Sequence, residues 1–256
     1  MTDRKSVLVF SAHAADFVWR AGGAIALYAS RGYRVRILCL SFGERGESQG
    51  AWKQPGMTIE KVKEIRQAES TRAAGILGAE IRFFDSGDYP IITTPETIQA
   101  IVEEYRALQP EFVLTHSFKD PYNPDHETAN RVSLETRVYS QALGYPAKGK
   151  PLNAPPVFIF EPHQPEQCNV KPNVILNIDE VWETKRKAFE VLAARKAQVA
   201  EAAKSGEGVD EAAVKRLASA QTLPVPVPML RGQITRDPMQ FAKEQNISGI
   251  EGVGEP

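Results

Sequence analysis

The chain has 256 residues, of which 42% are hydrophobic and 25% are charged, and its formal net charge at pH 7 is -1. These values are typical of a globular protein with a full core, and they provide no positive field that would attract nucleic acid or an anionic membrane. No linker rich in glycine, serine or proline divides the middle of the chain. We therefore expect a single domain over residues 1–256, with an extended arm from about residue 222.

The amino-terminal segment and the cysteines indicate where the protein works. The apolar run before His13 is too short for a signal-peptide core or a membrane span. Cys39 and Cys168 are far apart and lack C-x-x-C spacing, and Cys39 lies in an apolar run, as expected for a small core residue. These features favour a cytoplasmic protein with no membrane partner.

Apolar runs alternate with segments of helical spacing along the chain. Strands are predicted at residues 5–11, 34–41, 81–84, 112–115, 157–160 and 174–178, and helices at 21–31, 59–77, 95–108, 127–143 and 182–203. An extended proline-rich segment is predicted at 224–228 and a short helix near 239–245. The alternation predicts an α/β fold, namely a Rossmann-like, mostly parallel sheet with helices on both faces.

The four histidines, at positions 13, 116, 126 and 163, all follow the predicted carboxyl ends of strands. Ligands of such sheets bind at this edge, where the strand order reverses. If the order is 3-2-1-4-5, the first and fourth strands are neighbours, and the loops carrying His13 and His126 lie side by side. Four histidines on one rim favour a binding site over isolated surface positions.

His13, Asp16 and His126 are the candidate metal ligands. Two imidazole nitrogens and one carboxylate oxygen form the three-ligand pattern, with one open position, that is typical of catalytic zinc. The spacing of His13 and Asp16 on a strand-to-helix turn lets both side chains reach one point. Manganese, iron or cobalt suit the same ligands, so zinc is the expected metal but not the sole one.

Other polar residues on the same rim are candidates for catalysis. Glu47 and His163 are the candidates for proton transfer. Asp125 either orients a ligand histidine within the catalytic site or acts as a helix N-cap. His116 either hydrogen-bonds within the substrate pocket or has a structural role at the end of its strand. Arg66 is a surface charge by default, although an arginine near the pocket suits a substrate with carboxylates.

The sequence gives no support for two common functional classes. No glycine-rich phosphate-binding fingerprint follows the first strand, and there is no GKS or GKT, which disfavours nucleotide binding. Serine hydrolase chemistry has no support either, because the letters of G-x-S-x-G occur only at 46–50 (GESQG), within a polar loop and not on a strand-to-helix turn.

The chain resembles the LmbE/PIG-L-like family of zinc-dependent N-deacetylases, whose motifs are A-H-P-D-D and H-P-D-H. Residues 12–16 read AHAAD and residues 123–126 read NPDH. The segments GERG at 43–46, RQAE at 66–69 and RG at 231–232 are also similar to that family. The resemblance implies a Rossmann-like fold with zinc on His13, Asp16 and His126.

Two departures from the family motifs bear on the reaction. The resemblance implies that a deacetylase carries its general base where this chain has Ala15, and an assisting histidine where it has Asn123. General acid–base groups each contribute about 10²–10⁴-fold. The chain thus keeps the metal ligands but lacks both deacetylation groups.

A hydratase branch of the family, which acts in bacterial breakdown of gallate and protocatechuate, has a similar pattern. That resemblance implies addition of water across a conjugated C=C bond of a small tricarboxylate. Glu47, His163 and Asp125 are then the candidate catalytic residues. The candidates for binding substrate are Arg66, His116, Asn123 and Arg20, with Lys119 less favoured.

Two alternative functions remain open from the sequence. The first is a zinc-dependent N-deacetylase of an amino-sugar amide, in which Glu47 or Asp125 replaces the missing base; Ala15 argues against it. The second is a non-catalytic metal- or metabolite-binding protein; retention of all three ligands argues against that. A homo-oligomer is possible, because the segments 182–203 and 224–228 are suited either to a subunit interface or to packing on their own domain.

Overall fold

The computed structural model of the protein describes residues 4–192. In this range no helix is long and apolar enough to cross a membrane. The proposed arm from residue 222, the segments 224–228 and 239–245 and the residues 231–232 lie outside the described residues.

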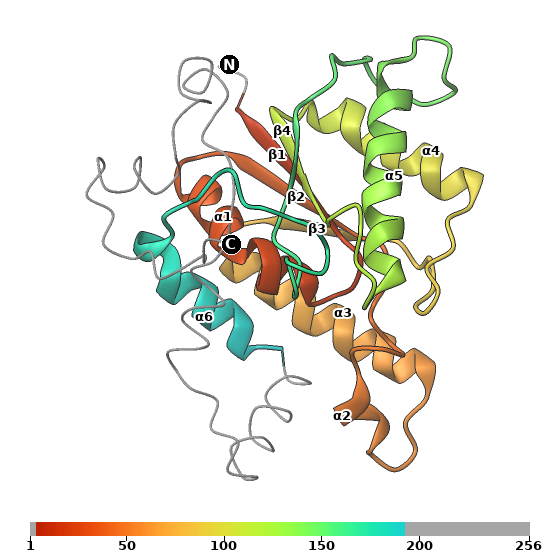
Figure 1. Ribbon diagram of the computed structural model, residues 1–256. Coiled ribbons are helices and arrows are strands. Elements are labelled where there is room, and N and C mark those ends of the chain that lie inside the picture. The colour runs from red at the N-terminus through yellow and green to blue at the C-terminus, as the bar shows by residue number, and fades with distance from the viewer. Residues whose placement is uncertain (1–3, 193–256) are drawn as a thin grey trace.

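Five parallel strands form one sheet in the order β3-β2-β1-β4-β5 (Figure 1). The strands are β1 (Ser6–Ser11), β2 (Arg34–Cys39), β3 (Glu80–Phe83), β4 (Phe112–Thr115) and β5 (Val157–Ile159). The order reverses between β1 and β4, which are neighbours. The predicted α/β class and the predicted strand order are both confirmed.

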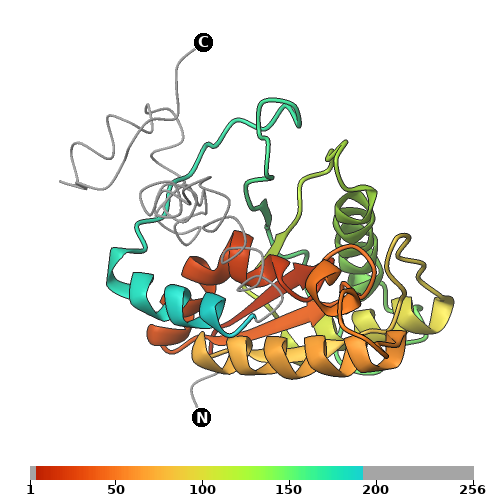
Figure 2. The same cartoon turned by 90° about the horizontal axis from the view of Figure 1, so that it is seen from below.

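Helices cover both faces of the sheet (Figure 2). Helices α1 (Asp16–Ser30), α3 (Ile59–Ile76) and α6 (Trp182–Glu190) lie against one face, and α4 (Pro95–Leu108) and α5 (Pro124–Gln141) lie against the other. A short helix, α2 (Gln49–Trp52), follows β2, and a single 3-10 turn, η1 (Asp179–Val181), precedes α6. The carboxyl ends of all five parallel strands therefore share one edge.

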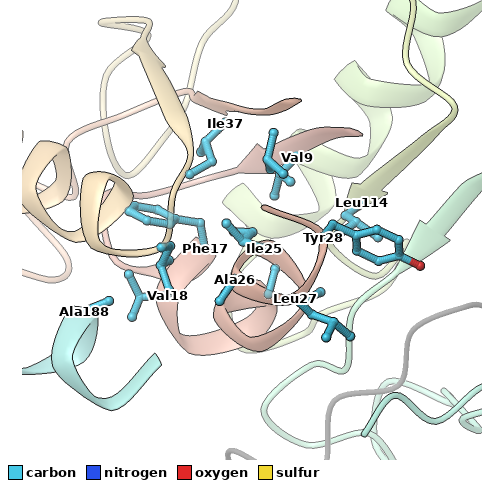
Figure 3. Close-up of a cluster of buried hydrophobic side chains, with 14 of the residues drawn as sticks. Val9, Phe17, Val18, Ile25, Ala26, Leu27, Tyr28, Ile37, Leu114 and Ala188 are labelled. Carbon is cyan, nitrogen blue, oxygen red and sulfur yellow. The ribbon is translucent and has the colours of Figure 1, made fainter. Parts of the chain in front are cut away.

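A continuous apolar cluster joins the sheet to α1 and α6 (Figure 3). Val9, Ile37 and Leu114 come from three adjacent strands, and they pack with Ile25 of α1 and Ala188 of α6 in that cluster. All six residues of β1 are buried, as expected for the central strand of a parallel sheet covered on both faces. This packing fixes the loop that follows β1.

The structure corrects two predicted elements. Helix α1 begins at Asp16, whereas the sequence predicted a start at residue 21, so this candidate ligand lies in the first helical turn. Residues 174–178 do not form the predicted sixth strand. Their alternation of apolar residues arises because Leu176 and Ile178 pack into the core cluster, not because they pair with the sheet. Helix α6 ends at Glu190, and the remainder of the predicted helix beyond residue 192 is outside the described residues.

Candidate active site

His13, Asp16 and His126 meet at the carboxyl edge of the sheet, between the neighbouring strands β1 and β4. One ligand atom from each lies within 4.8 Å of the other two, and all three residues are buried. Asp16 Oδ2 lies 3.1 Å from His13 Nδ1 and 3.4 Å from His126 Nε2. The structure thus brings together the three residues that the sequence singled out as metal ligands.

Short-range hydrogen bonds hold the turn that carries His13 and Asp16. The backbone N–H of His13 donates to Asp16 Oδ2 at 2.9 Å. Ser11 Oγ donates to the His13 carbonyl at 2.6 Å and accepts from the backbone N–H of Phe17 at 3.1 Å. The last residue of β1 therefore fixes the first turn of α1.

Two carboxylates face the opposite nitrogen of the His13 ring. His13 Nε2 lies 3.3 Å from Asp125 Oδ2 and 3.3 Å from Asp88 Oδ1. Asp125 also accepts hydrogen bonds from the backbone N–H groups of Tyr89 and Ile91. A carboxylate behind a ligand histidine fixes its tautomer and orientation and increases its basicity. The N-cap of α5 is Asn123, so the geometry of Asp125 matches the orienting role rather than the capping role.

His126 has a carboxylate partner of its own. His126 Nδ1 lies 2.8 Å from Asp120 Oδ2, while Nε2 is buried and makes no hydrogen bond to any residue between 4 and 192. A buried nitrogen without a hydrogen bond is costly, and such an atom needs a ligand or an ion. Because this nitrogen faces Asp16, the arrangement fits a metal ion bound by the three side chains.

The electrostatic field at this point favours a cation. Burial lowers the pKa of His13, but hydrogen bonds to Asp125, Asp16 and Asp88 outweigh that effect and raise its pKa well above the ordinary value. For His126, burial is likewise outweighed by Asp16 and Asp120, and its pKa is raised. Burial raises the pKa of Asp16, but the two histidines bring it well below the ordinary value. The same field favours a proton or a metal ion.

A second group of possible metal ligands consists of His13, Asp88 and Asp125. Three of its four carboxylate oxygens are already engaged, because Asp88 Oδ2 accepts from the backbone N–H groups of Arg45 and Gly46, and both oxygens of Asp125 accept from backbone N–H groups. Asp88 Oδ1 makes no hydrogen bond within residues 4–192 and faces His13 Nε2 at 3.3 Å. This group is therefore better described as the support of His13 than as a separate metal site.

Glu47 of the loop after β2 pairs with the buried Arg66 of α3. Arg66 Nη2 lies 3.2 Å from Glu47 Oε2, and Nη1 lies 3.1 Å from Glu69 Oε2. Arg66 is only 1% exposed, so it is not a surface charge. Three protein groups engage its guanidinium, including the Phe42 carbonyl at 3.4 Å. Arg66 thus positions Glu47, and its direct contact with substrate stays a prediction.

Glu47 follows the carboxyl end of β2 and therefore lies at the same edge of the sheet as the metal ligands. Burial is the main cause that raises the pKa of Tyr89, and the charges of His13, Asp88 and Glu47 also act on it. The ring of Tyr89 contacts the ring of His13, with centroids 5.6 Å apart. The charge of Glu47 therefore acts on Tyr89, whose ring contacts the candidate ligand His13.

The ring of His116 contacts Phe160, which directly follows β5. The His116 ring also stacks on His126 with centroids 4.2 Å apart, and His116 Nε2 accepts the backbone N–H of Ala12 at 3.0 Å. Burial is the main cause that lowers the pKa of His116 well below the ordinary value, and the charges of His126 and Arg20 lower it further. His116 is therefore a neutral neighbour of the ligands, at the same rim as Arg20.

Sequence reasoning missed Glu161, which comes directly after β5. Burial raises its pKa to about 7, Arg20 acts to lower it, and Glu166 acts to raise it. His163, two positions later, is exposed and belongs to neither group of possible metal ligands. Glu161 follows the end of β5, as His163 does. This position was the one feature of the sequence that could have identified Glu161 as a candidate site residue.

Sequence reasoning also missed the carboxylates of Asp88 and Asp120 and the ring of Tyr89. All three lie in loops after β3 or β4 and at the carboxyl edge of the sheet. Their partners are separated from them by several residues to several tens of residues along the chain, so spacing alone does not reveal the contacts.

The model of the PIG-L family, described as GlcNAc-PI de-N-acetylase, matches residues 8–136. That segment holds all three candidate ligands and covers half of the chain. The chain belongs to the PIG-L family. This membership confirms the resemblance proposed from the two motifs, and PIG-L proteins are metal-dependent, which agrees with the ligand cluster.

Some PIG-L relatives are hydratases. The chain is 53% identical over 192 residues to 4-oxalmesaconate hydratase of Pseudomonas putida KT2440, a match that covers 75% of this chain and 74% of the relative. The crystal structure of 4-carboxy-2-hydroxymuconate hydratase from the same organism is similar, with a TM-score of 0.74 and 46% identity. It covers 86% of this chain and 97% of that one.

Deacetylases of the PIG-L family are more distant. A 1D-myo-inositol 2-acetamido-2-deoxy-alpha-D-glucopyranoside deacetylase of Rhodococcus erythropolis is 30% identical over 175 residues, with 59% of each chain covered. The N,N'-diacetylchitobiose deacetylase of Pyrococcus horikoshii shares the fold, with a TM-score of 0.64 at 24% identity.

Proposed function

We propose that this protein is a metal-dependent hydratase that adds water to 4-carboxy-2-hydroxymuconate or its keto tautomer, 4-oxalmesaconate, to give 4-carboxy-4-hydroxy-2-oxoadipate. The observation that carries the proposal is the identity with hydratases over most of the chain, together with a complete ligand cluster. The reaction belongs to the breakdown of gallate or protocatechuate, in the cytoplasm.

The residue between the two ligands of the first turn supports a hydratase over a deacetylase. Ala15 is fully buried beside His13 and Asp16, and its methyl side chain offers neither a base nor a hydrogen-bonding group at that point. Asn123 caps α5 through its side-chain oxygen, which accepts from the backbone N–H of Asp125. An amide has no useful acid–base chemistry near neutral pH. The positions of the two deacetylation groups are therefore inert.

Zinc is the metal that we assign to His13, Asp16 and His126. When bound, zinc supplies Lewis acidity at this point. The protein contributes the orientation of the ligands, because Asp125 and Asp88 hold His13 while Asp120 holds His126. The ligand set also suits manganese, iron or cobalt, and metal analysis of the purified protein decides between them.

Proton transfer requires groups beyond the ligands, because hydration moves one proton from water and delivers another to carbon. We assign these steps to Glu47 and His163. Glu47 is the better defined of the two, because Arg66 holds its carboxylate at 3.2 Å in a mostly buried position. His163 is assigned on its sequence position after β5, and its side chain is exposed. Asp125 takes part in catalysis through its contact with His13.

The substrate carboxylates need positive or neutral hydrogen-bonding groups. Arg20 lies four residues after Asp16 on α1, and its charge acts on His116, Asp120 and Glu161. We assign to Arg20 the binding of one carboxylate, with His116 and Asn123 as polar neighbours. Arg66 remains a further candidate for binding a substrate carboxylate, because it contacts Glu47 of the loop after β2.

One assay separates the hydratase from the deacetylase. Purified, zinc-loaded protein is mixed with 4-carboxy-2-hydroxymuconate, and the loss of its conjugated ultraviolet absorbance is followed. A parallel sample receives an N-acetylglucosamine derivative, and released acetate is measured. We expect loss of absorbance that stops after chelation and returns with zinc, and no acetate. Acetate release without loss of absorbance would contradict the proposal.

A further inference from the structure

Tyr89 occupies a constrained position in the segment between β3 and α4. Its φ angle is 43°, in the left-handed region, which costs a non-glycine residue on the order of 1 kcal/mol. Hydrogen bonds compensate this cost. The backbone N–H of Tyr89 donates to Asp125 Oδ2 at 3.0 Å, and the preceding Asp88 accepts from the backbone N–H of Gly46 at 2.9 Å. The loops after β2 and β3 and the first turn of α5 therefore hold Tyr89 in place together.

The ring of Tyr89 forms a wall beside the ligand His13. The two rings meet edge to face at 5.6 Å between centroids. On another side the ring lies so close to Gly46 that a Cβ atom there would be 2.1 Å from Tyr89 Cε2. The residue is nevertheless 46% exposed. One part of the ring is therefore packed against His13 and Gly46, and another part is exposed and accessible to a bound molecule.

The hydroxyl group of Tyr89 has a defined polarity. It accepts a hydrogen bond from Asn123 Nδ2 at 3.2 Å. The carboxamide of Asn123 cannot turn over without loss, because its Oδ1 accepts the backbone N–H of Asp125 at the start of α5. The phenol oxygen is therefore the acceptor in this pair. Its own O–H is left to donate, and no residue between 4 and 192 accepts that proton.

We propose that Tyr89 is a substrate-binding residue whose phenolic O–H donates a hydrogen bond to an anionic oxygen of the tricarboxylate. The position of the ring against His13 and the orientation imposed by Asn123 carry the proposal, which rests on the proposed hydratase function. The absence of a side chain at Gly46 then leaves room for the Tyr89 ring. A hydrogen bond from a neutral donor to a charged acceptor is among the stronger ones in proteins.

The variant Tyr89→Phe removes the hydroxyl and keeps the ring. We expect kcat/KM for 4-carboxy-2-hydroxymuconate to fall by about 10- to 100-fold, as for a lost hydrogen bond to a charged group. The bound metal and the melting temperature should stay unchanged, because the ring contacts remain. The matched control is Tyr139→Phe, whose hydroxyl bonds to Glu135 near the end of α5 and which should retain wild-type rates.

A binding measurement separates this proposal from the hydratase proposal. Propane-1,2,3-tricarboxylate is titrated calorimetrically into the zinc-loaded wild type and the Tyr89→Phe variant, and we expect about tenfold weaker binding to the variant. Equal affinity, or turnover within about twofold of wild type, would overturn the role of Tyr89. Loss of metal from the variant would also overturn it, because Tyr89 would then act as structural support. Failure of the wild type to hydrate the muconate overturns only the function.

Discussion

His126 and His116 stack on each other at 4.2 Å, yet the two sides of the rim that they mark differ in charge. On the His126 side, Asp16 and Asp120 outweigh burial and raise the pKa of the imidazole. On the His116 side, burial and the charges of His126 and Arg20 lower the pKa. We name these the cation side (His13, Asp16, Asp88, Asp120, Asp125 and His126) and the anion side (Arg20, His116 and Glu161).

The difference shows how one small rim accommodates opposite charges. Four carboxylates gather around two histidines on the cation side, so that a cation there is stabilised at low dielectric. The anion side has an arginine, a neutral imidazole and a carboxyl group whose pKa is raised to about 7. A metal ion and the carboxylates of a substrate are therefore favoured at adjacent positions.

The largest expected effect separates the two stacked histidines. His126→Ala removes a ligand, and we expect the bound metal to be lost and kcat/KM to fall by at least about 1000-fold. His116→Gln keeps a hydrogen-bond acceptor for the N–H of Ala12, so the metal should remain bound. Metal content is measured by mass spectrometry after gel filtration. A full metal complement in His126→Ala would show that the ligands are misassigned.

A smaller effect is expected from the carboxylate that orients His126. Asp120→Asn keeps the shape of the side chain but removes the charge that raises the pKa of the imidazole. Such partners typically contribute about 10- to 100-fold to metal affinity. The measurement is competition for zinc with a chromophoric chelator. The control is Asp85→Asn, an exposed carboxylate paired with Lys63. Equal zinc affinity of Asp120→Asn and wild type would remove Asp120 from the cation side.

The third prediction concerns the pH dependence on the anion side. Glu161, with a pKa of about 7, is neutral below that pH and negative above it. Its charge opposes an anionic substrate and offsets Arg20, so kcat/KM should decline by about two- to fivefold as the pH rises through 7. In Glu161→Gln this decline should disappear, whereas the exposed Glu166→Gln should keep it. Rates are measured from pH 5.5 to 8.5. An unaltered decline of kcat/KM in Glu161→Gln would show that Glu161 does not cause this pH dependence.

The smallest expected effect is on stability, at Lys185 of α6, which packs against Gly22 and donates to the Trp19 carbonyl at 3.1 Å. Burial, and to a lesser extent Arg20, lowers its pKa to about 7 from the ordinary value of 10.5. Between those values the unfolded chain binds more protons, so stability rises with pH from 7 to 10.5. Below pH 7 the whole cost of burying the charge is present.

Lys185→Met should therefore raise the melting temperature at pH 7, by about 2–4 °C for each kcal/mol gained. The gain is reduced by the Trp19 carbonyl, which loses its donor, and it should shrink as the pH approaches 10. Thermal unfolding at pH 6, 7, 8.5 and 10 gives the measurement, with the exposed Lys187→Met as the control. A gain that grows with pH would have the wrong sign for this explanation.

Much of the fold could be predicted from the sequence because its signals are local. Predicted and observed bounds agree for α4 and β4, since Thr94 caps the helix and a short apolar run marks the strand. The failed strand at 174–178 shows the limit of this reasoning. Alternating burial of Leu176 and Ile178 is equally compatible with packing on helices, and only the tertiary structure distinguishes the two.

The candidate site was predictable in part for the same reason. His13 and Asp16 share one turn, and parallel topology places His126 beside them, so the ligand cluster follows from spacing and strand order. Asp120 and Asp88 were missed because their contacts with imidazoles depend on how loops fold across the rim. Glu161 was missed because its raised pKa depends on burial, which a single glutamate in a sequence does not reveal.

The arrangement of the rim separates two tasks along the chain. The β1-to-α1 turn and the first turn of α5, which follows β4, supply all three ligands, whereas Glu47, Tyr89 and Glu161 come from the loops after β2, β3 and β5. A substitution at Glu47, Tyr89 or Glu161 alters the groups that face a bound molecule and leaves the three metal ligands unchanged. The fold is therefore suited to divergence, since new reactions can arise around an old metal site by exchange of a few side chains.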